Sequence, residues 1–149
     1  MISGVRRASL VLLTILLVSG CGGGSGKRLS KQEYASKADA ICTRGSQRTK
    51  GLQESNLQQI AAATDQVAGI LGDAIRDLRK LKPPKDEQPL ADEWLSQVEK
   101  LKTDIEDLRD KAKANDRAGL AKVAVKAQQD DRRANQLATQ LGMSVCNNG

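Results

Sequence analysis

Apolar residues recur at intervals of three and four in four successive segments, and this spacing constrains the fold more than any other feature of the chain. One face of an α-helix repeats every 3.6 residues, so the spacing predicts amphipathic helices. Helix-breaking or turn-forming residues separate the segments, and no stretch has the alternation typical of a strand. We therefore predict an all-α fold, an up-down-up-down antiparallel four-helix bundle.

The first two predicted helices have recognisable starts. Ser30 and Glu33 have the spacing of a capping box, with Ser30 as the N-cap. Ser55 is the predicted N-cap of the second helix, which we expect to stop at Pro83 and Pro84 because proline lacks an amide hydrogen. The apolar stripes of these helices are Tyr34, Ala38, Ile41, Gly45 and Leu52, then Leu57, Ile60, Thr64, Val67, Leu71, Ile75, Leu78 and Leu81.

The third predicted helix begins between Asp86 and Pro89, and Asp116 can cap the fourth. Trp94 falls on the third stripe, so we expect it to anchor the core. Acids and bases alternate on the opposite side of that helix, and this pattern, which includes Asp104, is typical of a solvated face. The two stripes are Leu90, Trp94, Val98, Leu101, Ile105, Leu108 and Ala112, then Leu120, Val123, Ala127, Asp130, Ala134, Leu137 and Leu141.

Asp130 interrupts the apolar stripe of the fourth helix. Together with Asp131 it could form a metal site or an acid–base pair. The alternative is a carboxylate at the rim of the bundle, or one paired with Arg44, Arg48 or Tyr34 of the first helix. We favour this alternative.

The chain begins with the features of an export signal. Arg6 and Arg7 precede a mainly apolar run from Ala8 to Val18, which is too short to span a membrane. A buried core helix is the alternative, but the glycine-rich stretch that follows disfavours it. We expect residues 1–20 to be a cleaved signal peptide, 21–29 to be a tether, and 30–149 to form the bundle with its C-terminal tail.

The stretch Val18-Ser19-Gly20-Cys21 resembles the lipobox of bacterial lipoproteins, in which an aliphatic and two small residues precede a cysteine. The resemblance implies that the thiol of Cys21 receives a diacylglycerol and that a peptidase cuts just before it. The protein would then be extracytoplasmic, with the membrane as its partner through the lipid on Cys21. The alternative is an ordinary exported protein in which Cys21 is free or paired.

The chain has three cysteines, an odd number that needs an explanation in an exported protein. If Cys21 carries lipid, Cys42 and Cys146 remain as a pair, and outside the cytoplasm they can persist as a disulfide. Two buried free thiols are the alternative. The bond can close only if the tail beyond Gly142 turns back along the first helix, where we expect Met143 or Val145 to pack beneath it.

Three further stretches carry a family resemblance. Tyr34 to Cys42 reads YASKADAIC, Leu78 to Pro84 reads LRKLKPP, and Leu141 to Cys146 reads LGMSVC. Together they resemble segments of small lipoproteins of actinobacteria, over most of the mature chain. The resemblance implies a helical exported domain with Cys42 bonded to Cys146. It implies no established activity and no site residues beyond the cysteines.

Composition argues against several functions. There is no histidine, which removes the commonest general base and metal ligand, and no CxxC motif, nucleophile–base pair or phosphate-binding glycine loop. We therefore predict no catalysis, no catalytic residue, no metal and no cofactor. The chain has 24 Lys plus Arg against 18 Asp plus Glu, with one Trp, one Tyr and no Phe. This mild charge and the lack of aromatic residues predict no nucleic-acid partner.

Two classes of function remain. The first, which we expect, is an envelope interaction module, held at the bacterial cell membrane, that docks an unknown envelope protein or wall polymer. The second is a carrier that binds a small apolar ligand within the bundle. Exposed apolar patches or a groove between helices would favour docking. An enclosed cavity of roughly 300 Å³ or more, lined by Leu, Ile and Ala, would favour the carrier. A weaker third hypothesis is a divalent-ion site at Asp130 and Asp131.

Overall fold

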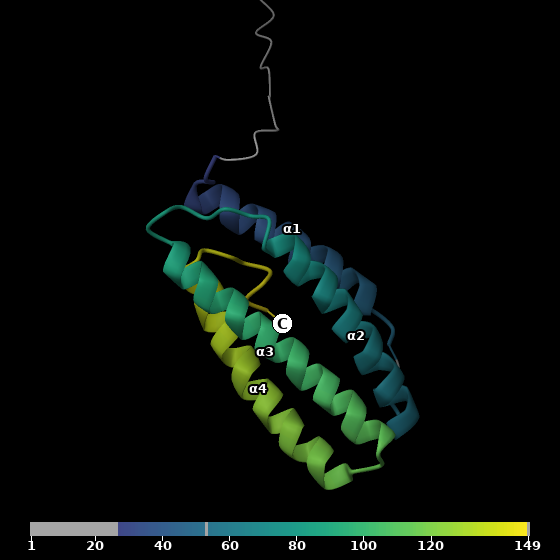
Figure 1. Cartoon of the computed structure of the whole chain (residues 1–149). Coiled ribbons are helices and arrows are strands. Elements are labelled where there is room, and N and C mark those ends of the chain that lie inside the picture. Colours follow the sequence, from purple (N-terminus) through teal and green to yellow (C-terminus); the bar gives the residue numbers. More distant parts are fainter. Residues whose placement is uncertain (1–26, 53, 149) are drawn as a thin grey trace, which may run out of the picture.

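A computed structural model describes residues 27–52 and 54–148, and within these residues it contains four helices and no strand. The helices are α1 (Lys31–Thr49), α2 (Leu57–Leu78), α3 (Gln88–Lys113) and α4 (Arg117–Gln140), and each runs antiparallel to the one before it (Figure 1). The predicted all-α four-helix bundle is confirmed. None of the helices described is both long and apolar enough to cross a membrane.

The expected signal peptide, the lipobox and Cys21 lie outside the described residues. The end of the expected tether is described, and it is bound to the bundle. The backbone N–H of Leu29 donates to the carbonyl of Lys82 at 2.8 Å. The guanidinium of Arg28 donates to the carbonyl of Pro83 at 2.9 Å. Residues 28 and 29 therefore attach to the loop between α2 and α3.

The helix ends follow mainly from local capping. Ser30 and Glu33 form the predicted capping box, because the Ser30 side chain accepts from the Glu33 N–H and the Glu33 carboxylate accepts from the Ser30 N–H. The Asp116 carboxylate caps α4 by accepting from the N–H of Gly119 at 2.8 Å. Gly142, just past α4, has a φ of 80°, which favours glycine at a helix C-terminus.

Two predicted boundaries of α2 are wrong. Asn56, not Ser55, is the N-cap, because the Asn56 side-chain oxygen accepts from the N–H of Gln59 at 2.9 Å. The helix also ends at Leu78, with Arg79 as its C-cap, before the prolines are reached.

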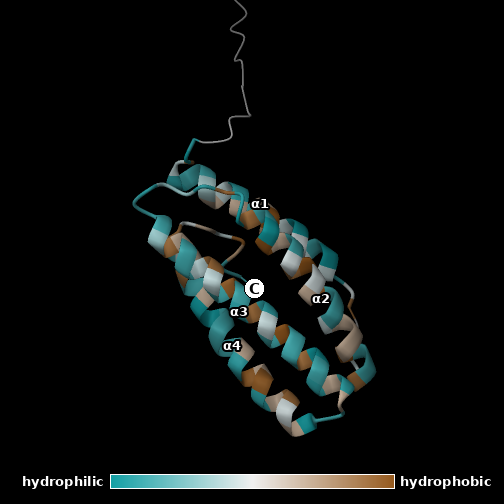
Figure 2. Ribbon diagram, viewed as in Figure 1, coloured by the Kyte–Doolittle hydropathy of each residue, from teal (hydrophilic) through white to brown (hydrophobic). Residues whose placement is uncertain are grey.

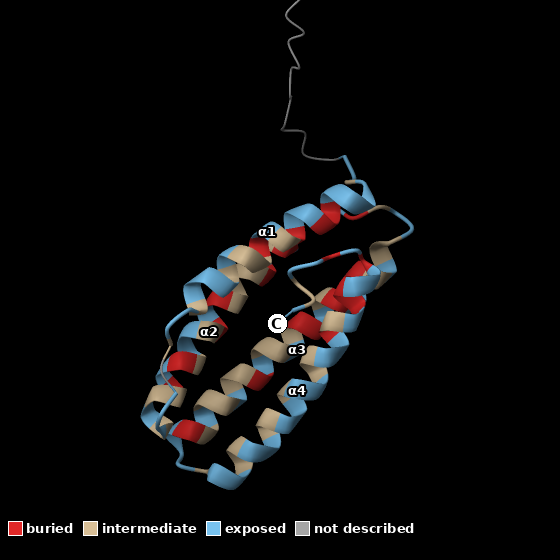
Figure 3. Ribbon diagram, turned by 180° about the vertical axis from the view of Figure 1, so that it is seen from behind, coloured by how far each residue is buried: buried red, intermediate tan, exposed pale blue. Residues whose placement is uncertain are grey.

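The core lies where the facing sides of the helices meet. Hydrophobic and buried residues gather on these sides (Figures 2 and 3). Trp94 is only 1% exposed, so its predicted role as a core anchor is confirmed. The buried core cluster comprises Tyr34, Ala35, Ala38, Ile41, Ile75, Leu78, Ala91, Trp94, Val98, Leu137, Ala138, Leu141 and Met143.

The bundle is open between its first and last helices. Within the described residues α1 packs on α2, α2 on α3 and α3 on α4, and no Cα of α1 lies within 8 Å of a Cα of α4. Residues 142–148, which we call the strap, fold back into the space between these two helices (Figure 1). Met143 of the strap is buried in the core, as expected, whereas Val145 is 37% exposed.

The strap is attached to α1 by a disulfide and by a carboxylate. Cys42 and Cys146 are bonded with an S–S distance of 2.07 Å and a Cα–Cα distance of 5.4 Å. The Asp39 carboxylate accepts from the backbone N–H groups of Ser144, Val145 and Cys146 at 2.8, 2.9 and 3.0 Å. Burial raises the pKa of Asp39, but these hydrogen bonds outweigh it and hold the pKa below its ordinary value.

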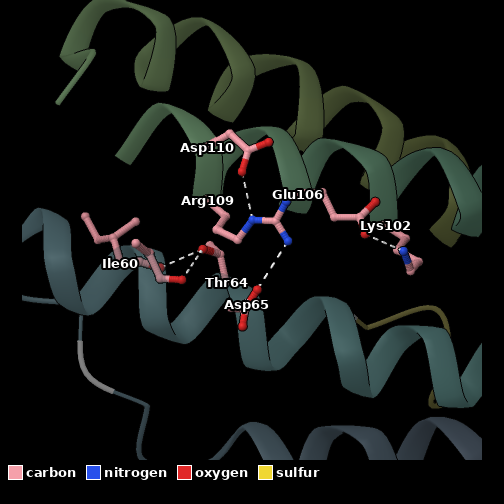
Figure 4. A network of polar contacts seen from close by, with 8 residues as sticks. Ile60, Thr64, Asp65, Lys102, Glu106, Arg109 and Asp110 are labelled. Carbon is pink, nitrogen blue, oxygen red and sulfur yellow. Dashed lines mark hydrogen bonds and ion pairs between the residues drawn. The ribbon is translucent and has the colours of Figure 1, made fainter. Parts of the chain in front are cut away.

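Charged side chains line the outer edge between α2 and α3 (Figure 4). The Arg109 guanidinium donates to Asp65 of α2 at 3.2 Å and to Asp110 of its own helix at 2.8 Å. Lys102 and Glu106 pair along α3 at 2.6 Å. These pairs are partly open to solvent and add little stability, and we assign them to the surface rather than to a site.

Candidate functional site: an apolar cleft between α1 and α4

The gap between α1 and α4 contains a cleft of about 630 Å³ beside the strap. Its floor comes from α2 and α3, and every residue that these two helices contribute to it is apolar. The floor residues are Val67, Ile70, Leu71, Ala74, Leu78, Trp94, Val98, Leu101 and Ile105. They extend over residues 67–78 of α2 and 94–105 of α3, which is about 16 Å at the helical rise per residue.

The walls of the cleft are more polar than its floor. Helix α1 contributes Cys42, Gly45, Ser46 and Thr49, and α4 contributes Asp131, Ala134 and Asn135. The strap lines the cleft with Ser144, Val145, Cys146 and Asn148. Because Ser46, Ser144 and Asn148 are exposed, the cleft opens to solvent along its α1 and strap edges. An apolar floor with a polar rim is the arrangement of a binding site for an apolar molecule.

Asp131 is the charged member of the cleft lining. The Asn135 side-chain amide donates to its Oδ2 atom at 3.1 Å. Within the described residues no lysine or arginine forms an ion pair with this carboxylate. The residue therefore presents a negative charge at the rim of an otherwise uncharged cleft.

A second polar cluster joins α3 to α4, away from the cleft. Asp104 is 1% exposed, so the prediction that it lies on a solvated face is wrong. Its Oδ1 atom lies 2.5 Å from the Lys126 ammonium, which also contacts Asp130 at 2.7 Å. The other oxygen of Asp104, Oδ2, is buried without a hydrogen-bond partner among the described residues.

The proposed partners of Asp130 on α1 are also wrong. Asp130 pairs with Lys126 one turn away on its own helix, and its backbone carbonyl accepts from the Gln97 side chain at 3.3 Å. The reason is geometric: the face of α4 that carries Asp130 packs on α3, whereas α1 lies across the cleft. Asp130 therefore lies beside α3 and Asp131 lines the cleft, so the two carboxylates do not form one site.

The cluster shifts the pKa values of its members in a consistent way. Burial raises the pKa of Asp104, because the charged carboxylate loses its hydration. The hydrogen bond from Lys126 lowers the pKa of Asp130, and the hydrogen bonds to Asp104 and Asp130 raise the pKa of Lys126 to about 12. The ammonium contacts both carboxylates, so the three side chains form an ion-pair cluster that joins α3 to α4.

The sequence-predicted residues divide between cleft and core. Cys42 and Cys146 join α1 to the strap at the edge of the cleft, and Cys21 lies outside the described residues. Trp94 belongs to both the core and the cleft lining. Sequence analysis singled out Asp131 as a possible metal ligand, but the periodicity of the helix did not show that it would face a cleft.

No group of three or more His, Cys, Asp or Glu side chains within the described residues is arranged to hold a metal ion. Comparisons with protein-family models, with curated proteins and with solved structures find no match for this chain.

Proposed function

We propose that the protein is a lipid-anchored, extracytoplasmic carrier that binds a small apolar ligand in the cleft between α1 and α4. The cleft carries the proposal through its volume and its apolar floor, although it opens to solvent and is not the enclosed cavity that we expected of a carrier. Its volume of about 630 Å³ and its apolar floor match the size and composition of small-molecule sites, which measure roughly 300–1,000 Å³. No catalytic step is part of this function.

The size of the cleft favours a small ligand over a docked helix. A helix that spanned the 16 Å floor, with a diameter of 10–12 Å, would occupy roughly 1,300–1,800 Å³. The cleft is too small to enclose such a helix, which could insert only one face along the open edge. The large hydrophobic residues exposed on the described surface are Val125 and Val145, and Val145 lines the cleft. Outside the cleft only Val125 remains among the described residues, which is too little to make a docking patch.

Docking of an envelope protein or wall polymer is the second candidate. The observation that favours it is the open edge of the cleft, along which an extended partner could insert apolar side chains. Proximity crosslinking of the native lipoprotein in its own cells, followed by mass spectrometry, tests this candidate. Recovery of one reproducible partner supports it, and recovery of only random envelope proteins removes it.

The anchor is proposed from the lipobox. Its support from the folded part is indirect: Cys42 and Cys146 are bonded to each other, which leaves Cys21 as the remaining cysteine of the three. Intact mass of the native protein under non-reducing conditions checks both assignments. We expect cleavage before Cys21, a diacylglycerol adduct on it, and the loss of two hydrogens for the disulfide. An unmodified Cys21 would contradict the anchor.

Gly45 offers a way to fill the cleft without disturbing the fold. It lies within α1 and lines the cleft, and an added Cβ would meet its nearest neighbour, Ile70, at an ordinary 3.8 Å. Gly45→Leu therefore places a side chain in the ligand's space while improving the helix propensity of α1. Gly69→Leu is the matched control, because Gly69 lies in α2 outside the cleft with no atom within 4 Å of an added Cβ.

The binding test uses the exported chain with Cys21→Ser, which needs no detergent, and the neutral fluorescent probe N-phenyl-1-naphthylamine. We expect the fluorescence of the probe to rise on binding, Gly45→Leu to weaken binding at least about tenfold, and Gly69→Leu to leave it unchanged. Absence of binding to the unsubstituted protein, or equal binding by both variants, would overturn the proposed function. A melting temperature no lower than that of the parent excludes unfolding of Gly45→Leu as the cause.

A further inference from the structure

We infer that the ligand of the cleft is a cationic amphiphile, an apolar body that carries a protonated amine or quaternary ammonium, and that Asp131 is its counter-charge. The inference rests on the proposed function and adds the chemical class of the ligand. It joins two observations, the apolar floor of the cleft and the carboxylate on its α4 wall.

The charge of Asp131 is not neutralised by the protein. Its neighbour Asp130 is paired with Lys126 at 2.7 Å, but Asp131 has no described ion-pair partner. The Asn135 amide holds one carboxylate oxygen, and no described residue donates to the other, Oδ1. A chain with more Lys and Arg than Asp and Glu leaves this acid without an ion-pair partner among the described residues, beside an apolar cleft.

The surroundings of Asp131 determine which headgroup it favours. Asp131 is half-buried, and the cleft contains no other charged side chain. An ammonium at this rim gains Coulomb attraction in a medium less polar than water, whereas a carboxylate or phosphate there is repelled. An uncharged headgroup should bind with an affinity between those of the ammonium and the carboxylate. The floor in turn selects a chain or ring body long enough to cover about 16 Å of Val, Leu and Ile.

Three probes of equal chain length separate the headgroup from the apolar body: dodecylamine, dodecanol and dodecanoate. Each displaces N-phenyl-1-naphthylamine from the exported Cys21→Ser chain, at concentrations below micelle formation. We expect the amine to bind about fivefold more tightly than the alcohol, the effect of one partly screened ion pair, and the carboxylate to bind most weakly. A higher salt concentration should reduce the difference in affinity between dodecylamine and dodecanol, because salt screens the ion pair.

Asp131→Asn removes the charge and keeps an oxygen to accept from Asn135. We expect this substitution to lower the affinity for dodecylamine about fivefold, so that it equals the affinity for dodecanol. The affinity for dodecanol itself should not change. Asp107→Asn is the matched control, since Asp107 is exposed on α3 outside the cleft and the substitution changes net charge equally.

The outcomes separate the two proposals. If dodecanol binds and dodecylamine binds no tighter, or if Asp131→Asn and Asp107→Asn behave alike, the ligand class is wrong and the carrier function stands. If none of the three probes binds, the carrier function fails and the ligand class fails with it. Tightest binding by dodecanoate would also overturn the ligand class.

Discussion

Asp104 shows how far the environment of one side chain can depart from its place in a charge pattern. Its neighbours Lys102 and Glu106 pair on the surface of α3, yet Asp104 faces α4 and is 1% exposed. Lys126 partly compensates this burial, although the lysine itself is 57% exposed and one carboxylate oxygen stays unpartnered. A buried carboxylate depends on its partner more than the partner depends on it.

Lys126→Ala should therefore destabilise the protein more than Asp104→Asn does. The first leaves a buried charge unpaired, for which we expect a loss of about 1–3 kcal/mol, and the second removes that charge. The raised pKa of Asp104 sets the sign of the pH dependence: the folded state favours the protonated acid. The stability of Lys126→Ala relative to the parent should thus be greatest below the ordinary pKa of aspartate, about 3.9, and fall as the pH rises above it.

Urea denaturation of Lys126→Ala, Asp104→Asn and the parent at several pH values between 3 and 7 measures these differences. Equal losses for the two variants, or a loss from Lys126→Ala that shrinks as the pH rises, would contradict the assignment of Asp104 as the dependent partner.

Among the helices, the starts are determined by residues that lie within four positions of one another. Three of the four starts have a side-chain cap, from Ser30, Asn56 and Asp116. The start of α3 has no side-chain cap. It carries Pro89 in its first turn instead, where a missing N–H has little consequence.

The start of α2 allows a direct comparison of two adjacent polar residues. Asn56→Ala removes the acceptor for the N–H of Gln59, so we expect a loss of about 1 kcal/mol in the free energy of unfolding. Ser55→Ala keeps the backbone N–H through which Ser55 contacts Gln59 and should change stability by no more than about 0.5 kcal/mol. Thermal and urea unfolding of both variants provide the measurement. A larger loss of stability for Ser55→Ala than for Asn56→Ala would indicate that Ser55, the residue predicted from sequence, is the N-cap.

At the scale of the whole molecule, the strap takes the place of a packed interface between α1 and α4. It fixes the distance between these helices with one covalent bond and with the hydrogen bonds to Asp39. A bundle closed in this way can keep an apolar space between two of its helices, because the separation does not depend on side chains that meet across the gap.

The double variant Cys42→Ser/Cys146→Ser tests the contribution of the covalent bond. The disulfide links residues 104 apart in sequence, and its removal should lower the free energy of unfolding by about 2–5 kcal/mol. Hydrogen exchange should speed up in residues 142–148 more than in α2 and α3. Urea unfolding of the oxidised parent, the reduced parent and the variant makes the comparison. A loss below about 1 kcal/mol would mean that Asp39 and Met143 alone hold the strap.

The features that could be predicted from the sequence are those that depend on neighbours a few residues apart. The spacing of apolar residues predicted four helices, and Ser30 and Asp116 were predicted as two of their caps. The pairing of Cys42 with Cys146 also followed from the cysteine count and the resemblance, and the return of the tail was a consequence of that pairing. All of these rest on short-range backbone geometry or on covalent chemistry.

The separation of α1 and α4, and with it the existence of the cleft, depends on how the four helices pack and could not be predicted from the sequence. The burial of Asp104, the partner of Asp130 and the exposure of Asp131 to the cleft depend on the same rotation and separation of helices. These quantities are set by how side-chain volumes from several helices fill a shared space. Periodicity states which face of a helix is apolar, but not whether a partner helix or an open cleft will meet it.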